Sequence, residues 1–182
     1  MRYVIIHGTF GNAQENRFPW LKEQLELQGH EVRVPELPTQ EEGMHEARCA
    51  ELQKQVPFTF DNDTMLIGHS LGAVFVLDIL NRERKKPVKK AILVSGFLHA
   101  LGNQTFDTLN APFLQQKWNR EEVKKNAEKF VILHWENDPY VPLSEAEGLQ
   151  EKLWCSMEII PNGGHLNETA GFVKFEEILK YL

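Results

Sequence analysis

A serine stands between two glycines where Gly68-His69-Ser70-Leu71-Gly72 separates two apolar runs. The run before it is short and suits a buried strand, and the run after it has helical spacing. A Gly-x-Ser-x-Gly turn between a strand and a helix is the setting of a nucleophile elbow, in which strained backbone exposes the serine hydroxyl. Glycines on either side avoid collisions across so sharp a turn. We therefore predict that Ser70 is a nucleophile.

A serine at its ordinary pKa is a weak nucleophile, so it needs a base, and the base needs a group that orients it. One later apolar run is followed by ENDPYVP, which contains Asp138 and the alternative acid Glu136, and the last run is followed by NGGHLNE, which contains His165. Taken singly, Asp138 suits a turn and His165 suits an ordinary loop. Together with Ser70 they occur in the order serine, acid, histidine that this arrangement requires. We predict that Ser70, Asp138 and His165 are catalytic.

An oxyanion would need two N–H donors. Leu71 begins the helix after the serine, so its N–H is one candidate, and the loop HGTFGN supplies Thr9 as the first choice for the other and Phe10 as the second. This loop does not match GxGxxG, and no GK[ST] occurs, which argues against nucleotide binding. The histidines show no metal-ligand spacing. We expect no metal site and no cofactor.

Substrate specificity is expected to depend on residues 97–118, which follow a predicted strand end. This segment is rich in large apolar side chains, and the substrate-binding candidates are Phe97, Leu98, Phe106 and Trp118. One interpretation is a short apolar cover over an acyl pocket. The alternative is ordinary packing of a loop and helix on the core, which is the more common position of apolar residues.

Short apolar runs alternate with amphipathic segments along the chain, which predicts an α/β fold. Strands are expected at 3–7, 31–37, 64–69, 90–96, 130–135 and 156–161, and helices at 20–29, 40–55, 71–84, 113–129, 144–153 and within 168–182, with 97–112 irregular. Nearly continuous apolar strands indicate a six-stranded, mostly parallel sheet with helices on both faces. Ligands then bind beyond the carboxyl ends of the strands. No repeat or linker appears, so we expect a single domain over 1–182.

Composition limits the partners. The 182 residues are 42% apolar and 25% charged, with a net charge of −6, which is typical of a globular protein and argues against nucleic acid or an anionic membrane as main partners. The two cysteines, Cys49 and Cys155, suggest free thiols in a reducing compartment. We see no signal peptide and no apolar stretch near the ~20 residues that span a bilayer. The expected location is cytoplasmic.

The segments VIIHG, IGHSLGA, ILVSGF, NDPYVP and GGHLNETAGF extend from the first predicted strand to the last helix. On these segments the chain resembles the compact α/β-hydrolases typified by retinoblastoma-binding protein nine and the bacterial YdeN-type serine hydrolases. The resemblance implies Ser70 as nucleophile, Asp138 as acid and His165 as base. It also implies a sheet without the two leading strands of larger α/β-hydrolases, no large lid, and activity on small esters.

The expected function is therefore hydrolysis of a small-molecule acyl substrate through an acyl-enzyme. A thioesterase or peptidase would use the same three residues, so these activities stay open. A second alternative is a protein-interaction module that keeps the hydrolase fold with little turnover, because fold does not determine function.

Overall fold

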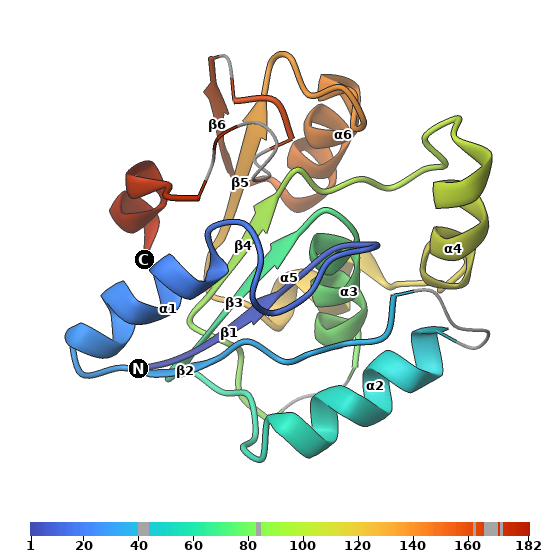
Figure 1. The fold of residues 1–182 in the computed structure, drawn as a ribbon. Helices are drawn as coiled ribbons and strands as arrows, with labels where there is room; N and C mark the ends of the chain where they lie inside the picture. The colour runs from blue at the N-terminus through green and yellow to red at the C-terminus, as the bar shows by residue number, and fades with distance from the viewer. Residues whose placement is uncertain (40–43, 83–84, 162, 166–170, 172) are drawn as a thin grey trace.

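The computed structural model describes residues 1–39, 44–82, 85–161, 163–165, 171 and 173–182, and it shows a central sheet with helices on both faces (Figure 1). The strands are β1 (Arg2–Ile6), β2 (Glu31–Arg33), β3 (Thr64–His69), β4 (Lys90–Val94), β5 (Phe130–Trp135) and β6 (Ser156–Ile160). The helices are α1 (Phe18–Leu27), α2 (Met44–Gln55), α3 (Leu71–Leu80), α4 (Gln104–Leu114), α5 (Arg120–Lys125), α6 (Leu143–Leu153) and the 3₁₀ helix η2 (Glu176–Tyr181).

The six strands lie in the order β2-β1-β3-β4-β5-β6, and every neighbouring pair is parallel. This confirms the predicted six-stranded parallel sheet. Because all strands run the same way, the segments that follow them meet at one edge. Ile6 pairs with Gly68, so the loop after β1 lies beside the turn after β3. β5 likewise pairs with β6, which brings the segments that carry Asp138 and His165 together.

Side chains alternate between the two faces of the sheet, as the pleat of a strand requires. In β1, Val4 and Ile6 join a buried cluster with residues of α2, α3, α5 and α6. Tyr3 and Ile5 join a second cluster, which includes residues of α1 and η2. Because both faces of the central strands are covered by apolar residues, these strands occur in the sequence as continuous apolar runs.

The structure corrects the prediction for residues 97–129. Instead of an irregular segment and one long helix, it contains α4 and the separate short helix α5. The Asn103 side chain begins α4 by accepting hydrogen bonds from the N–H groups of Thr105 (3.1 Å) and Phe106 (3.2 Å). Pro112 lies inside the last part of α4. Proline normally marks a helix boundary, so the sequence pattern does not predict this helix.

The last helix, predicted within 168–182, is the short 3₁₀ helix η2. Parts of the predicted helices at 40–43, 83–84, 168–170 and 172 lie outside the described residues.

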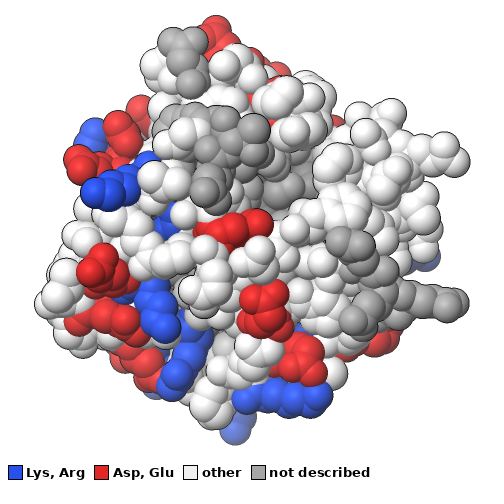
Figure 2. All heavy atoms as spheres, in the orientation of Figure 1, with Lys and Arg blue, Asp and Glu red and all other residues white. Residues whose placement is uncertain are grey.

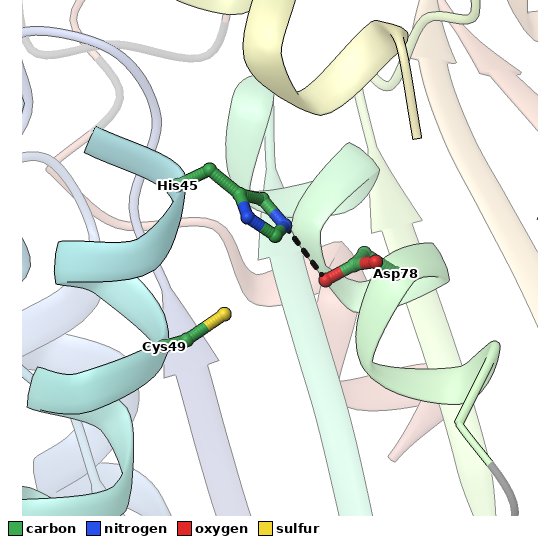
Figure 3. A group of neighbouring side chains, drawn as sticks. All are labelled: His45, Cys49 and Asp78. Atoms are coloured by element: carbon green, nitrogen blue, oxygen red, sulfur yellow. Dashed lines mark hydrogen bonds and ion pairs between the residues drawn. The ribbon is translucent and has the colours of Figure 1, made fainter. Parts of the chain in front are cut away.

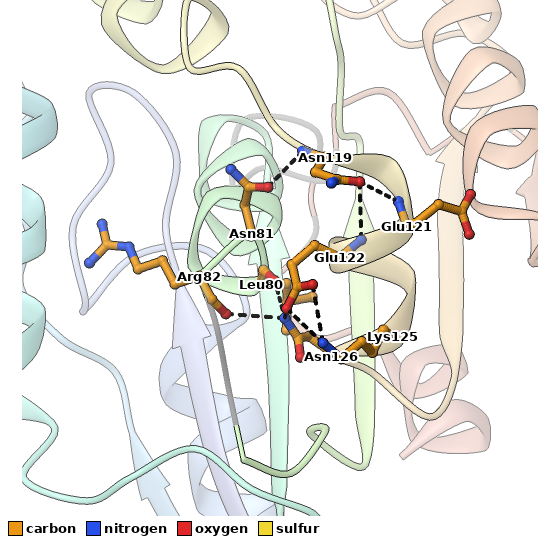
Figure 4. Close-up of polar contacts among 8 residues, drawn as sticks. All are labelled: Leu80, Asn81, Arg82, Asn119, Glu121, Glu122, Lys125 and Asn126. Atoms are coloured by element: carbon orange, nitrogen blue, oxygen red, sulfur yellow. Dashed lines mark hydrogen bonds and ion pairs between the residues drawn. The ribbon is translucent and has the colours of Figure 1, made fainter.

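Asparagine side chains join the end of α3 to both ends of α5 (Figure 4). The buried Asn126 amide donates to the carbonyl oxygens of Leu80 (2.8 Å) and Arg82 (3.1 Å), which satisfies acceptors left open at the end of α3. Asn81 accepts from the Asn119 N–H at 2.7 Å, and the Asn119 side chain caps the first turn of α5. These contacts anchor α3, the helix that begins directly after Ser70.

Within the described part of the chain, none of the helices combines the length and the hydrophobicity needed to cross a membrane. Figure 2 shows acidic and basic side chains interspersed on the face of the molecule seen in Figure 1. The described residues form no broad basic surface on that face, in keeping with the net charge of −6.

Two glycines allow close packing at the turn after β3, one within the turn and one against β1. A Cβ atom on Gly72 would lie 2.2 Å from the main-chain oxygen of Ile6, and one on Gly68 would lie 2.4 Å from the main-chain oxygen of Gly72. The collision expected across the turn therefore applies to Gly68. At Gly72 the obstacle is the neighbouring strand β1, which only the packed sheet brings near.

We expect Gly72→Ala to lower the free energy of unfolding by about 3 kcal/mol, because the added methyl group must displace the main chain of β1. Gly148→Ala in α6 is the matched control: its Cβ would lie 3.9 Å from the Leu98 side chain, an ordinary contact. Helix propensity predicts a gain of about 0.5–1 kcal/mol there. Urea denaturation measures both, and a Gly72→Ala protein as stable as the wild type would contradict the close packing.

Candidate active site

Ser70 lies at the junction of β3 and α3 with strained backbone. Its φ of 55° and ψ of −123° fall where non-glycine residues are rarely found. The strain is held by hydrogen bonds on both sides, from the Ser70 N–H to the Val94 oxygen and from the Ala73 N–H to the Ser70 oxygen, each 2.9 Å long. Such backbone strain is characteristic of functional positions, and here it leaves the hydroxyl at the carboxyl ends of the strands.

Asp138 and His165 form a close pair. The His165 Nδ1–H donates to both carboxylate oxygens of Asp138, at 2.8 and 3.0 Å, and the Asp138 side chain is fully buried. The carboxylate also accepts the N–H groups of Tyr140 (2.9 Å) and Val141 (3.0 Å). Burial alone raises the pKa of Asp138, but the hydrogen bonds from His165 and the main chain outweigh it and lower the pKa overall. The ionised carboxylate thus holds the His165 ring with Nε2 free to accept a proton.

A second histidine fixes the main chain of His165. The His69 Nε2–H donates to the His165 carbonyl at 2.9 Å, and the two ring centroids are 4.9 Å apart. Burial, with the nearby charge of Arg17, lowers the pKa of His69 well below its usual value, so its ring is neutral. The sequence shows His69 only as the residue that precedes Ser70 in the turn. Its contact with a residue far along the chain becomes visible only in the folded structure.

Ser70 and His165 line the same cavity, which has a volume of about 410 Å³. Within the described residues no hydrogen bond joins the Ser70 hydroxyl to the His165 ring. In enzymes without substrate such bonds are often long and tighten only in the reacting complex. The structure therefore brings the three predicted catalytic residues to one place, with the acid–base contact formed and the serine at the cavity wall.

The loop after β1 packs directly against Ser70. A Cβ on Gly8 would lie 2.9 Å from the Ser70 Cβ and 3.4 Å from its Oγ, so glycine is required there. Thr9 and Phe10 follow in the cavity wall, and the Thr9 hydroxyl donates to the side-chain oxygen of Asn110 at 2.6 Å. The Leu71 side chain is fully buried in the core at the start of α3, so a role for Leu71 in the site would fall to its main-chain N–H.

The four predicted substrate-binding residues lie in three different places. Phe106 lines the cavity beside Ser70. Phe97 is fully buried in the core, so the packing interpretation describes it. Leu98 and Trp118 line a separate cavity of only about 20 Å³. The segment after β4 thus divides between core and cavity, because α4 turns one of its faces toward Ser70.

The sequence pattern does not predict several residues of the cavity wall, including Gly8, Glu15, Asn110 and Tyr140. The Tyr140 ring meets the His165 ring edge-on, with centroids 5.1 Å apart. Its place two residues after Asp138 was a usable signal. Asn110 gave none, because only the position of α4 brings it to Thr9.

A cluster of His45, Cys49 and Asp78 joins α2 to α3 away from this cavity (Figure 3). The His45 Nε2 lies 3.0 Å from an oxygen of Asp78. The Arg82 guanidinium donates to the same Asp78 oxygen (3.3 Å) and to the Cys49 sulfur (2.9 Å). A positive charge already faces the thiol and the carboxylate, so we interpret the cluster as a polar link between the two helices.

These observations define an α/β-hydrolase fold with a serine at the elbow. A family model described as "Serine hydrolase" matches residues 3–182. The chain therefore belongs to the serine hydrolase family. It is 28% identical to YdeN of Bacillus subtilis (strain 168) over 169 residues, which cover 92% of this chain and 87% of that protein. The crystal structure of the ydeN gene product superposes with a TM-score of 0.89 at 24% identity, covering 99% and 95% of the two chains. Serine hydrolase RBBP9 of Rattus norvegicus is 23% identical over 184 residues, covering 97% and 91%.

His7, at the end of β1, is buried beneath the loop that touches Ser70. Its Nε2 accepts the Leu37 N–H at 3.0 Å, so its Nδ1 carries the proton and donates to the Gly8 oxygen at 3.0 Å. Burial and the positive charge of Arg48 lower the pKa of His7 to about 4. A protonated ring would lose the bond from Leu37, because Nε2 could no longer accept.

We expect the free energy of unfolding to fall as the pH drops from 7.5 to 4.5. Unfolded His7 binds a proton below its ordinary pKa of about 6.5, whereas folded His7 does so only near 4, so acid favours the unfolded chain. His7 alone accounts for a loss of about 2–3 kcal/mol by pH 4.5. Urea unfolding across this range tests it, and a free energy that stays constant would contradict the neutral, buried ring.

Proposed function

We propose that this protein hydrolyses small carboxylic esters through an acyl-enzyme on Ser70. The observation that supports this most is the Asp138–His165 hydrogen bond of 2.8 Å in the same site as the strained Ser70. An imidazole held by a buried carboxylate is the base that a serine nucleophile needs. Membership of the serine hydrolase family supports the same class of chemistry.

In the proposed mechanism the Ser70 oxygen attacks the ester carbonyl carbon, and its proton passes to His165 Nε2. Asp138 keeps the ring in the correct tautomer and stabilises the imidazolium. The N–H groups of Thr9 and Leu71 bind the oxyanion, and one such donor lowers the barrier by about 3 kcal/mol. His165 then protonates the departing alcohol, and water, activated by the same ring, releases the acid from Ser70. Each of these steps uses groups of this chain.

The cavity wall favours small, uncharged acyl groups. The rings of Phe10, Phe106 and Tyr140 form a row across it, with centroids 5.4 and 6.0 Å apart, and this row gives the cavity an aromatic side. The acidic side chain of Glu15 also lines the cavity and disfavours anionic groups by charge repulsion. A volume of about 410 Å³ suits a small ligand rather than a polypeptide segment. These features favour simple esters over peptides and highly anionic thioesters.

The proposed location is the cytoplasm. Cys49 and Cys155 are both free thiols, which is the usual state of cysteines in a reducing compartment.

We expect wild-type protein to react with a fluorophosphonate probe and to hydrolyse p-nitrophenyl acetate, and Ser70→Ala to do neither. Gel fluorescence and release of p-nitrophenol measure the two reactions, and circular dichroism checks that the variant folds. Asp138→Asn should keep the fold and lose about 10⁴-fold in kcat, since the wrong tautomer of His165 would face Ser70. Folded wild-type protein that neither reacts with the probe nor turns over an ester would instead favour a protein-interaction role.

We expect Phe106→Ala to lower kcat/KM for p-nitrophenyl hexanoate about 10-fold while that for the acetate changes less than about threefold. The longer acyl chain loses apolar contact with the aromatic row, and the acetate does not reach it. Trp118→Ala is the matched control, because Trp118 lines the small separate cavity. The ratio of kcat/KM for the hexanoate to kcat/KM for the acetate is compared between the variants. If this ratio changes in Trp118→Ala and not in Phe106→Ala, the aromatic row does not recognise the acyl chain.

A further inference from the structure

Arg48, on α2, is fully buried directly beneath the loop that follows β1. Its guanidinium donates to three main-chain carbonyl oxygens: Nε to Pro38 (2.8 Å), Nη1 to His7 (3.1 Å) and Nη2 to Gly8 (2.9 Å). Two of these carbonyls belong to consecutive residues of the loop that touches Ser70. The guanidinium therefore holds two successive peptide units in one orientation.

The Gly8 carbonyl is the most constrained group in this loop. It accepts hydrogen bonds from Arg48, from the His7 Nδ1–H at 3.0 Å and from the Gly11 N–H at 3.4 Å. The described peptide bonds include no cis bond, so the N–H of Thr9 points away from the Gly8 carbonyl on the opposite side of the same peptide plane. With the carbonyl directed at the buried arginine, this N–H lies on the side of the peptide away from Arg48, and both Gly8 and Thr9 line the cavity with Ser70.

The chemical cost of this arrangement indicates a role beyond packing. Burial lowers the pKa of Arg48 to about 10, and the charge of Glu36 only partly offsets that effect. Taking a charge out of water costs free energy that the hydrogen bonds of the buried group must offset. A rigid fork of five donors is, however, well suited to fix several carbonyls at once.

We propose that Arg48 is a positioning residue for the oxyanion hole, in which it locks the Gly8–Thr9 peptide so that the Thr9 N–H faces the reacting carbonyl. The inference rests on the proposed ester hydrolysis at Ser70. In that reaction Ser70 adds to the carbonyl carbon, its proton passes to His165, and the carbonyl oxygen takes the negative charge that the Thr9 N–H stabilises. Without Arg48 the peptide is free to rotate, and the donor is lost for part of the time.

The test compares Arg48→Gln and Arg48→Lys with Arg82→Gln. Arg82 also lies in the layer between α2 and α3, but it contacts Cys49 and Asp78 rather than the loop, so its variant controls for the loss of a guanidinium. Steady-state kinetics on p-nitrophenyl acetate give kcat and KM. Inhibition by an alkyl trifluoromethyl ketone, whose adduct with Ser70 carries an oxyanion, is compared with inhibition by the matching methyl ketone.

We expect kcat to fall about 10- to 100-fold in Arg48→Gln, with KM changed less than about threefold, since complete loss of an oxyanion donor costs 10²–10³. The inhibition constant of the trifluoromethyl ketone should rise in parallel with the fall in kcat/KM, and that of the methyl ketone should not change. Arg48→Lys should fall between Arg48→Gln and wild type, because one ammonium group cannot reach three carbonyls in the same geometry. Arg82→Gln should retain wild-type kcat.

The proposal is overturned if folded Arg48→Gln keeps its kcat, or if both ketones weaken equally, since that would show general damage to the cavity. If Arg48→Gln does not fold, the same test is made with Arg48→Lys, by the ratio of the inhibition constant of the trifluoromethyl ketone to that of the methyl ketone. Failure of both variants to fold would assign Arg48 a purely structural role and overturn the proposal. Wild-type protein inactive toward esters and the fluorophosphonate probe would remove the proposed function itself, and the Arg48 inference with it.

Discussion

The close contact between β1 and the turn after β3 is the constraint on which the site depends. The main chain of Ile6 lies where any side chain on residue 72 would be, so the start of α3 can approach β1 only because that residue is glycine. Ser70 is held at positive φ between these elements, and Gly8 touches it from the other side. Without this contact the strands could still pair, but the serine hydroxyl and the loop after β1 would be separated.

The site is supported by polar groups buried below it. His7, His69 and Arg48 are each almost fully buried, and each hydrogen-bonds to main-chain groups rather than to bulk solvent. Such groups cost desolvation energy and are retained where their hydrogen bonds fix a conformation. Here they fix the two segments that must face Ser70, which are the loop after β1 and the residue His165. In this part of the molecule, burial of polar groups costs folding free energy, and their hydrogen bonds hold the main chain of the site in one conformation.

The aromatic part of the cavity wall is built differently. Phe10, Phe106 and Tyr140 come from three segments, and Phe106 meets the Phe10 ring edge-on and the Tyr140 ring at a tilt. Two of them, Phe10 and Tyr140, are more than 40% exposed, which leaves their rings room to adjust. Hydrogen bonds therefore hold the residues proposed for catalysis. The aromatic residues proposed to face the substrate are held by van der Waals contacts between their rings.

Much of this organisation follows from the sequence alone. The alternation of apolar runs and amphipathic segments determined a parallel six-stranded sheet, and the order of Ser70, Asp138 and His165 pointed to one edge of it, because the ends of parallel strands meet there. Local spacing could not show that α4 continues through Pro112, or that Phe97 packs in the core while Phe106 reaches the cavity. Nor could it show that Arg48 lies beneath Gly8, 40 residues away in the chain. Those contacts depend on how helices pack across the sheet, and no periodicity within a single segment records the position of its neighbours.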